Sequence, residues 1–219
     1  EKTSYPQKNA SIAVMPFNNL SGDPEQDFIA DGISENIIST LSKMPQFFVI
    51  SRNSSFFYKN KSVKIRQVGS ELGVRFVLEG SVLKSDEQIR INAQLIDSVN
   101  GNHVWSETYD RKWANFLSLL DEITLAVARA LTVEVGHTYP EELTKVLTDN
   151  LEAWLAIQKA SFYRLRATRE DNAKAKDLAK KAIDLDPNYI DGYIHLAFTL
   201  MAEARWGWSK SPRESMKQA

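Results

Sequence analysis

The stretch SIAVMPFNNLSGDPEQDFIADG, from Ser11 to Gly32, decides the fold of the first half of this chain. Ile12–Met15 is a continuous apolar run closed by Pro16, which is typical of a strand covered on both faces. The segment NNLSGDPEQ then has the composition of a loop. From Asp27, apolar residues recur every four positions, which predicts an amphipathic helix to about Lys43. Strands and helices therefore alternate.

The segments after this helix continue the alternation. Phe47–Ser51 is a second apolar strand, which is followed by an aromatic and basic stretch, Arg52–Arg66. A short helix is expected next, with Ser62 as its cap and Gly73 as its left-handed stop. The aromatic and basic stretch is a candidate binding surface, but an ordinary strand end with a solvated lysine loop fits it better.

The last part of this region predicts an antiparallel meander. Arg75–Leu83 has strand character, and Ile89–Leu95 alternates apolar with polar residues, as a strand with one buried face does. Asn100-Gly101 is a strong hairpin signal that leads to a third strand ending near Tyr109. A long helix then closes the domain near Val135. The expected fold is α/β, with a mixed sheet and packed helices.

Composition limits the function classes. The 219 residues are 43% apolar, with a net charge of -1 and pI near 6.4, so no uniform positive field is available for nucleic acid or an anionic membrane. The chain has no cysteine, which fits cytoplasm and periplasm alike. No apolar run approaches the ~20 residues that a membrane helix needs. Residues 1–10 lack the core of a signal peptide, and the start without methionine suggests a fragment or processed chain.

Four ranges divide the chain: a linker over 1–10, the α/β domain over 11–136, a linker over 137–149, and helical repeats over 150–219. Beyond the second linker the periodicity is purely helical. Pro187 marks the end of one helical repeat unit. In this unit, small residues occupy the positions where two helices approach closely. These residues are Ala175, Ala179 and Ala182.

Two similar phrases support a helical repeat that resembles the tetratricopeptide (TPR) unit. They are Trp154-x-x-Ile157 and Tyr193-x-x-Leu196-Ala197, and their aromatic residues lie 39 positions apart. That is about five more than the ~34-residue TPR period, so the surplus is expected in the RLRATRED segment. Fewer than about three such repeats are rarely stable alone. More repeats are therefore expected after Ala219, or support from the first domain.

Four acidic residues gather in the first loop and helix start: Asp23, Glu25, Asp27 and Asp31. Their spacing suggests a calcium loop, but the EF-hand needs glycine at the sixth place and a carboxylate at the twelfth. Phe28 and Ser34 stand at those places. Acidic residues also favour a helix N-terminus through its dipole, which is the better interpretation. The sequence predicts no metal site and no cofactor.

Residues for other chemistry are scattered. His103, His137 and His195 have no paired-ligand spacing, Ser54 and Ser55 lack a nucleophile elbow, and no phosphate-binding glycine loop is present. QVGSELGV resembles the first part of a helix-turn-helix, but the β-rich RFVLEGSV that follows offers no recognition helix. The sequence predicts no catalytic residues and no nucleic-acid binding.

Several phrases together identify a family resemblance. SIAVMPFNNLSGDPEQDFIADG, VISRNSSFFYKNK, ELGVRFVLEGSV, GNHVWSETYDR and LDEIT resemble the TolB amino-terminal-like domain over nearly all of residues 11–135. In bacterial signalling proteins this module sits between a class III nucleotide cyclase or winged-helix domain and TPR repeats. The cyclase domain itself has no counterpart here. The resemblance implies a regulatory segment, not an enzyme, although the parent protein could be an adenylate or guanylate cyclase.

Three hypotheses follow for function. The first is a non-catalytic interaction segment of a signalling protein, whose TPR helices bind a protein partner. The candidate binding residues are Trp154, Tyr163 and Tyr193. Trp154 and Tyr193 also match packing positions of the repeat. The second is the C-terminal part of a nucleotide cyclase, with a winged-helix regulator as the alternative parent. The third is a periplasmic or small-molecule-binding module. Fusion to a cyclase favours the cytoplasm, and a preceding transmembrane helix favours the periplasm.

Overall fold

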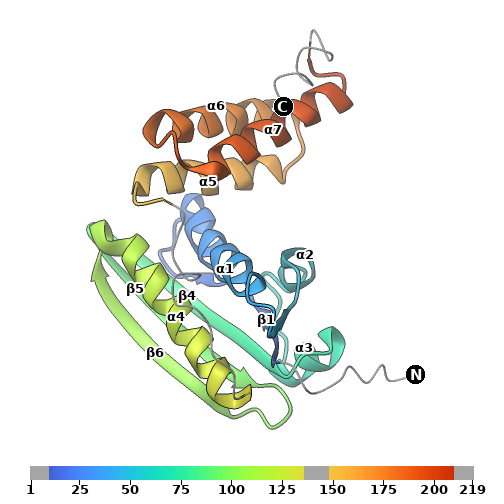
Figure 1. Cartoon of the computed structure of the whole chain (residues 1–219), viewed down its shortest axis with the longest axis vertical. Helices are drawn as coiled ribbons and strands as arrows, with labels where there is room; N and C mark the ends of the chain where they lie inside the picture. The colour runs from blue at the N-terminus through green and yellow to red at the C-terminus, as the bar shows by residue number, and fades with distance from the viewer. Residues whose placement is uncertain (1–9, 136–147, 210–219) are drawn as a thin grey trace. The chain divides into compact units, whose positions relative to one another are not determined.

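A computed structural model describes residues 10–135 and 148–209 and divides the chain into two units, Glu1–Val146 and Leu147–Ala219. In the described part of the chain, the first unit contains a mixed sheet with four α-helices, and the second contains three α-helices (Figure 1). The linker expected over 137–149 falls largely outside the described residues.

The sheet of the first unit has the strand order β3-β1-β4-β5-β6, with a short β2 paired to β4. β1 lies between β3 and β4 and is parallel to both, whereas β4, β5 and β6 form an antiparallel meander. The mixed α/β fold and its meander are thereby confirmed. The strand bounds are Ala10–Val14 (β1), Asn18–Asn19 (β2), Phe47–Val49 (β3), Phe76–Ser85 (β4), Gln88–Asp97 (β5) and His103–Lys112 (β6).

Helices connect the parallel strands and cover the sheet. The β1–α1–β3 and β3–α3–β4 connections run in opposite directions across the sheet, so right-handed crossovers place α1 and α3 on opposite faces. α4 packs beside α1 (Figure 1). The helix bounds are Pro24–Gln26 (the 3-10 turn η1), Asp27–Ser42 (α1), Arg52–Phe56 (α2), Ile65–Leu72 (α3), Trp113–Asn115 (the 3-10 turn η2) and Phe116–Val135 (α4).

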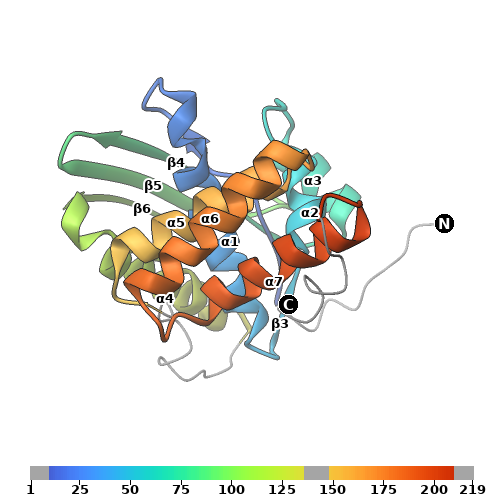
Figure 2. The same ribbon diagram turned by 90° about the horizontal axis from the view of Figure 1, so that it is seen from above.

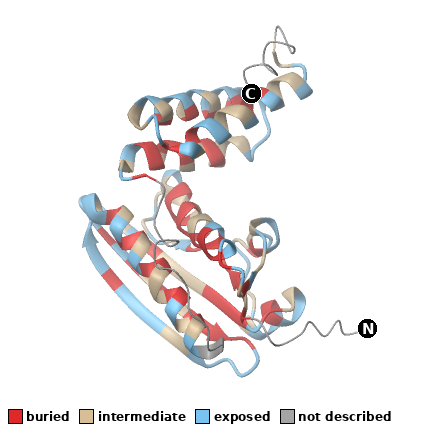
Figure 3. Ribbon diagram, viewed as in Figure 1, coloured by how far each residue is buried: buried red, intermediate tan, exposed pale blue. Residues whose placement is uncertain are grey.

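The larger core lies between the sheet and the α1–α4 pair. Alternate residues of β1, β4 and β5 share one face, and those of this face are inaccessible to solvent. Apolar residues of α1 and α4 at helical spacing are buried to the same degree, as Figure 3 shows. Burying one such side chain contributes about 1.5–3 kcal/mol. These residues are Ile12, Val14, Phe76, Leu78, Ile91, Leu95, Ile33, Ile37, Leu41, Leu120, Ile123 and Val127.

The opposite face of the sheet is apolar only over its parallel half. Ala13, Met15 and Val77 are buried there with Tyr58 and Val68. Over the meander this face is polar. Asn92 of β5 donates to the Ser81 hydroxyl of β4 at 3.1 Å and accepts from Thr108 of β6 at 2.8 Å, so side-chain hydrogen bonds cross all three strands. This polar face follows from the alternation expected in the sequence.

Two local expectations between β3 and α3 were wrong. The strand beginning at Phe47 ends at Val49, and a helical turn, α2, starts at Arg52 where the end of a strand before a lysine loop was expected. Asn and Ser are unfavourable in helix interiors, so the composition of this segment did not indicate a helical turn. The N-cap of α3 is Lys64, with no side-chain cap, and not Ser62. At the other end Gly73 takes φ 66, which confirms the left-handed stop.

The hairpin between β5 and β6 is confirmed, but its connection is longer than a two-residue turn. Residues 98–102 link the two strands. The Asp97 carboxylate accepts the amide of Val99 at 2.9 Å, and Gly101 takes φ 80. Asp97 also accepts from the Arg75 guanidinium at 3.2 Å. The Asn-Gly signal therefore located the reversal, while Asp97 organises the loop.

The second unit is formed by α5 (Leu151–Arg164), α6 (Arg169–Leu185) and α7 (Ile190–Arg205), which lie side by side (Figure 2). Asn150 and Thr168 cap the first two helices by accepting the amides of Ala153 and Asp171. The short connections make neighbouring helices antiparallel.

Small residues form much of the core of this second unit. Ala175, Ala179 and Ala182 of α6 are fully buried, and Ala182 packs in one cluster with Ile157 and Tyr189. Small side chains let the helix axes approach closely. Among the helices of both described ranges, none combines the length and apolar character needed to span a bilayer.

Candidate functional site

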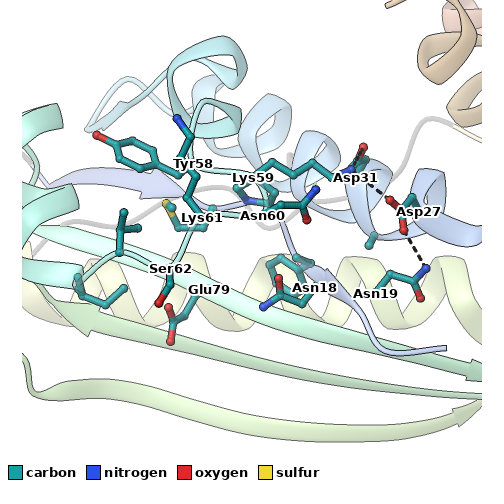
Figure 4. Close-up of a pocket in the computed structure, with 16 residues that line it drawn as sticks. Asn18, Asn19, Asp27, Asp31, Tyr58, Lys59, Asn60, Lys61, Ser62 and Glu79 are labelled. Carbon is teal, nitrogen blue, oxygen red and sulfur yellow. Dashed lines mark hydrogen bonds and ion pairs between the residues drawn. The ribbon is translucent and has the colours of Figure 1, made fainter. Parts of the chain in front are cut away.

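A cavity of about 390 Å³ opens in the first unit beside the carboxyl end of β1. Three stretches and one strand residue line it (Figure 4). They are Met15–Asn19 after β1, the positions Asp27, Ala30 and Asp31 on α1, the positions Tyr58–Val63 and Ile65 before and at the start of α3, and Glu79 on β4.

The topology of the sheet explains this location. β1 has parallel neighbours on both sides, and the helices that follow leave toward opposite faces. Connections that diverge in this way open a crevice at the carboxyl ends of parallel strands, where ligands of α/β proteins commonly bind. The cavity lies at this switch point.

Lys59 crosses the cavity wall to reach α1. Its ammonium group donates to both carboxylate oxygens of Asp31 at 2.7 Å and lies 3.7 Å from Asp27. Asn19 completes the network by donating to the Asp27 carboxylate at 2.9 Å and to the Asp23 carbonyl at 2.8 Å. The loop after β1, the start of α1 and the segment after α2 are thus joined by polar side chains.

Burial opposes the charge of Asp31. Its side chain is 13% exposed. The pKa of Asp31 is raised above its ordinary value by desolvation, although the hydrogen bond and charge of Lys59 act in the lowering direction. Keeping the Asp31 carboxyl ionised beside Lys59 therefore costs solvation free energy. An ionised group with little access to water depends strongly on its partner of opposite charge.

The acidic residues near the start of α1 have structural partners. Asp23 caps the 3-10 turn by accepting the Glu25 amide at 2.9 Å, while Asp27 and Asp31 bind Lys59. Within residues 10–135 and 148–209, no three His, Cys, Asp or Glu side chains group as a metal site would require. The interpretation of these residues as a helix N-terminus fits their geometry.

The aromatic and basic stretch makes many contacts within the molecule. Arg52 pairs with Glu35 at 3.2 Å and lies over the Phe56 ring, and Lys61 lies over the Phe57 ring. The Tyr58 hydroxyl donates to Glu71 at 2.5 Å. Burial and Glu71 raise the pKa of Tyr58 to about 12. Through these side-chain contacts the stretch holds α1 and α3 in place beside the cavity.

The three candidate binding aromatics of the second unit have different environments. Trp154 is only 1% exposed, so it belongs to the helix core. Tyr163 is partly exposed, with the Lys174 ammonium 5.1 Å from its ring centroid. Tyr193 is half-exposed, and its hydroxyl donates to the Pro187 carbonyl at 3.1 Å. Their part in binding a partner stays a prediction.

The scattered histidines and serines are placed as follows. His103 begins β6 and is exposed, and His195 Nδ1 lies 3.0 Å from the Asp191 carbonyl in α7. His137 lies outside the described residues. Ser54 forms a hydroxyl pair with Ser51 at 3.1 Å.

The cavity is the site that sequence reasoning missed. Asp27, Asp31 and Lys59 were each visible as charged residues, but no sequence spacing indicated that they meet. The available signal was the position of the polar loop NNLSGDPEQ directly after a buried parallel strand.

Comparisons with known proteins address both units. Residues 7–125 match the family model described as the second domain of HilA/YgeH-like transcriptional regulators. "Putative adenylate cyclase 3" of Rhizobium meliloti (strain 1021) is 38% identical over 209 residues, which cover 95% of this chain. The chain spans only 36% of the length of that relative.

Solved structures give weaker similarities. TolB from Acinetobacter baumannii is 18% identical with a TM-score of 0.43, covering 61% of this chain and 31% of that protein. Lipoprotein GNA1162 from Neisseria meningitidis is 20% identical with a TM-score of 0.41, covering 60% and 99% of the two chains. The LpoB C-terminal domain from Escherichia coli is 18% identical with a TM-score of 0.37, covering 47% and 82%.

Proposed function

This chain belongs to the family of the second domain of HilA/YgeH-like transcriptional regulators, and from that premise we propose that it is a non-catalytic regulatory and protein-interaction segment of a bacterial signalling protein. The observation that carries the proposal is the alignment of 209 residues with a protein named as an adenylate cyclase. This alignment extends through the α/β unit into the helical unit. The parent protein is accordingly an adenylate or guanylate cyclase, with this segment C-terminal to its catalytic domain.

The helical unit supplies the interaction surface in this proposal. Its three antiparallel helices, the buried alanines of α6 and the turn at Pro187 support an incomplete TPR array. Partner contact would involve Tyr163 and Tyr193, whose rings are accessible. Trp154 would support the surface from the core.

A winged-helix transcriptional regulator is the second candidate parent. The family model is described for transcriptional regulators, and this observation favours it. In that case the DNA-binding domain lies elsewhere in the protein, because α3 is followed directly by β4 and not by a recognition helix.

The coding sequence upstream of Glu1 and the activity of the full-length protein test the proposal. We expect the longer protein to convert ATP to cyclic AMP with Mg²⁺, and the 219-residue chain to form none. Removal of α5–α7 from the longer protein is expected to change the rate of cyclic AMP formation. A full-length protein that binds a specific DNA site and forms no cyclic nucleotide would instead establish the transcriptional alternative.

A further inference from the structure

The cavity beside the carboxyl end of β1 has the size of a site for a small ligand. Its volume of about 390 Å³ lies toward the low end of the ~300–1,000 Å³ range of ligand pockets. Buried side chains form the apolar part of its lining, and they are Met15, Phe17, Ala30 and Tyr58. Polar side chains form the rest, and their charges and partners decide which ligand chemistry fits.

Carboxylates outnumber ammonium groups in this lining. They are Asp27, Asp31 and Glu79 against Lys59 and Lys61. The Lys59 ammonium group lies 2.7 Å from Asp31 and 3.7 Å from Asp27, so two carboxylates share one cation. The Lys61 ammonium group lies 3.2 Å from the centroid of the exposed Phe57 ring, which is not part of the lining. The cavity therefore has an excess of negative charge.

Glu79 contributes one part of this excess. The alternation along β4 places it on the sheet face opposite to that of Leu78, and its carboxylate accepts from the Gln94 amide at 2.5 Å. Among the residues that the structure describes, no cationic side chain pairs with Glu79. An amide donor leaves the negative charge of a carboxylate in place, so this wall of the cavity attracts a cation.

The negative charge is divided between two ends of the cavity. Figure 4 shows Glu79 at one end of the lining and Asp27 with Asp31 at the other. Asn18 and Asn60 lie between them, and within residues 10–135 and 148–209 their side chains have no hydrogen-bond partner. Side-chain amides donate and accept hydrogen bonds without adding charge. The lining is thus complementary to a ligand that has a positive group at each end.

We propose that this cavity binds a short aliphatic diamine or polyamine, with one ammonium group at Glu79 and another at Asp27. Asp27 is more available than Asp31, because the Lys59 ammonium group lies 1.0 Å farther from it (3.7 against 2.7 Å). Met15 and Tyr58 supply apolar surface for the methylene chain. An anionic ligand would meet charges of its own sign. The inference concerns the α/β unit and does not depend on the regulatory role proposed for the chain.

Calorimetric titration and thermal denaturation of the 219-residue chain test the proposal with probes that share a four-carbon chain. Putrescine carries two positive charges, butane-1,4-diol carries none, and succinate carries two negative charges. We expect putrescine and the longer spermidine to bind and to raise the melting temperature, and the diol and succinate to do neither. The affinity for putrescine should fall as salt is added. Absence of binding by both amines, or equal binding of the diol or succinate, would overturn the proposal.

Matched variants locate the binding. Glu79→Gln keeps an oxygen that can accept from Gln94 but removes the charge, and it should weaken putrescine binding about tenfold or more. Asp27→Asn should weaken it in the same direction. Glu87→Gln makes the same change at an exposed position between β4 and β5, outside the lining, and should leave the affinity unchanged. Unchanged affinity in Glu79→Gln, or an equal loss in Glu87→Gln, would show attraction to the general surface charge and overturn the site. Circular dichroism without ligand checks that each variant is folded.

Discussion

The Lys59 ammonium group lies 2.7 Å from both carboxylate oxygens of Asp31, although 28 residues separate the two in the chain. The contact joins the segment after α2 to a partly buried position of α1 at the cavity. Asp31 has an unfavourable solvation environment, as its raised pKa indicates. The pair therefore stabilises the cavity wall chiefly because the Lys59 ammonium group compensates a carboxylate that has little access to water.

Replacing Lys59 with methionine should destabilise the first unit by about 1–3 kcal/mol, because it leaves the Asp31 carboxylate without its cation. Adding Asp31→Asn to this variant should recover part of the loss, since the buried charge is then removed as well. Chemical denaturation of the four proteins in a double-mutant cycle measures the coupling.

Lys61→Met is the matched control for the Lys59 variant. Lys61 lies over the exposed Phe57 ring, so its loss should change stability by less than about 1 kcal/mol. Equal losses for the two lysine variants would contradict a special role for the Lys59–Asp31 pair.

Tyr58→Phe should change the dependence of stability on alkaline pH. Burial and Glu71 raise the pKa of Tyr58 from 10.0 to about 12. Because this pKa is raised by folding, the protonated hydroxyl stabilises the fold below pH 10, and the contribution is lost as pH rises from 10 toward 12. Denaturation curves should therefore show a smaller alkaline loss for the variant. The hydrogen bond from Tyr58 lowers the pKa of Glu71, so this pKa should rise in the variant. NMR titration measures the change.

Gly69→Ala should destabilise the packing of α3. A Cβ atom at Gly69 would lie 2.1 Å from the Ser98 hydroxyl and 2.3 Å from its Cβ. The Ser98 hydroxyl already donates to the Val74 carbonyl at 2.7 Å, so it cannot move freely. We expect a loss of about 1–3 kcal/mol in thermal or chemical denaturation, despite the better helix propensity of alanine. Ser70→Ala, an exposed neighbour on α3, should be neutral or slightly stabilising.

Trp154→Ala and Tyr193→Ala should have different effects on the helical unit. Trp154 is buried, so its truncation should cost about 3–5 kcal/mol. Tyr193 is half-exposed, and its truncation should cost about 1 kcal/mol or less. If α5–α7 bind a protein partner, Tyr193→Ala should reduce retention of the partner in crosslinking experiments without unfolding. Unchanged retention by this folded variant would remove Tyr193 from the proposed surface.

Periodicity predicted the regular elements because it reports which face of each element is buried. The four-residue recurrence from Ile29 to Leu41 located α1, and the alternation from Ile89 to Leu95 located β5. The turn α2 was missed because its stability comes from contacts such as Arg52 with Glu35, and not from helix propensity.

The periodicity of the sequence could not predict the cavity. Its polar residues come from separate segments, which the parallel pairing of β1 with β3 and β4 brings together. The charge of Lys59 predicted only a solvated loop, since a charged residue reveals nothing about a partner distant in sequence.

The sequence by itself determined the α/β class, the meander, the left-handed stop at Gly73 and the helical character of the second half, because these depend on local spacing and backbone preference. The tertiary structure alone decided that Lys59 meets Asp31 and that the Ile190, Ile194 and Phe198 side chains of α7 stay about half exposed. Both depend on how the elements pack against one another, which is a property of contacts distant in sequence.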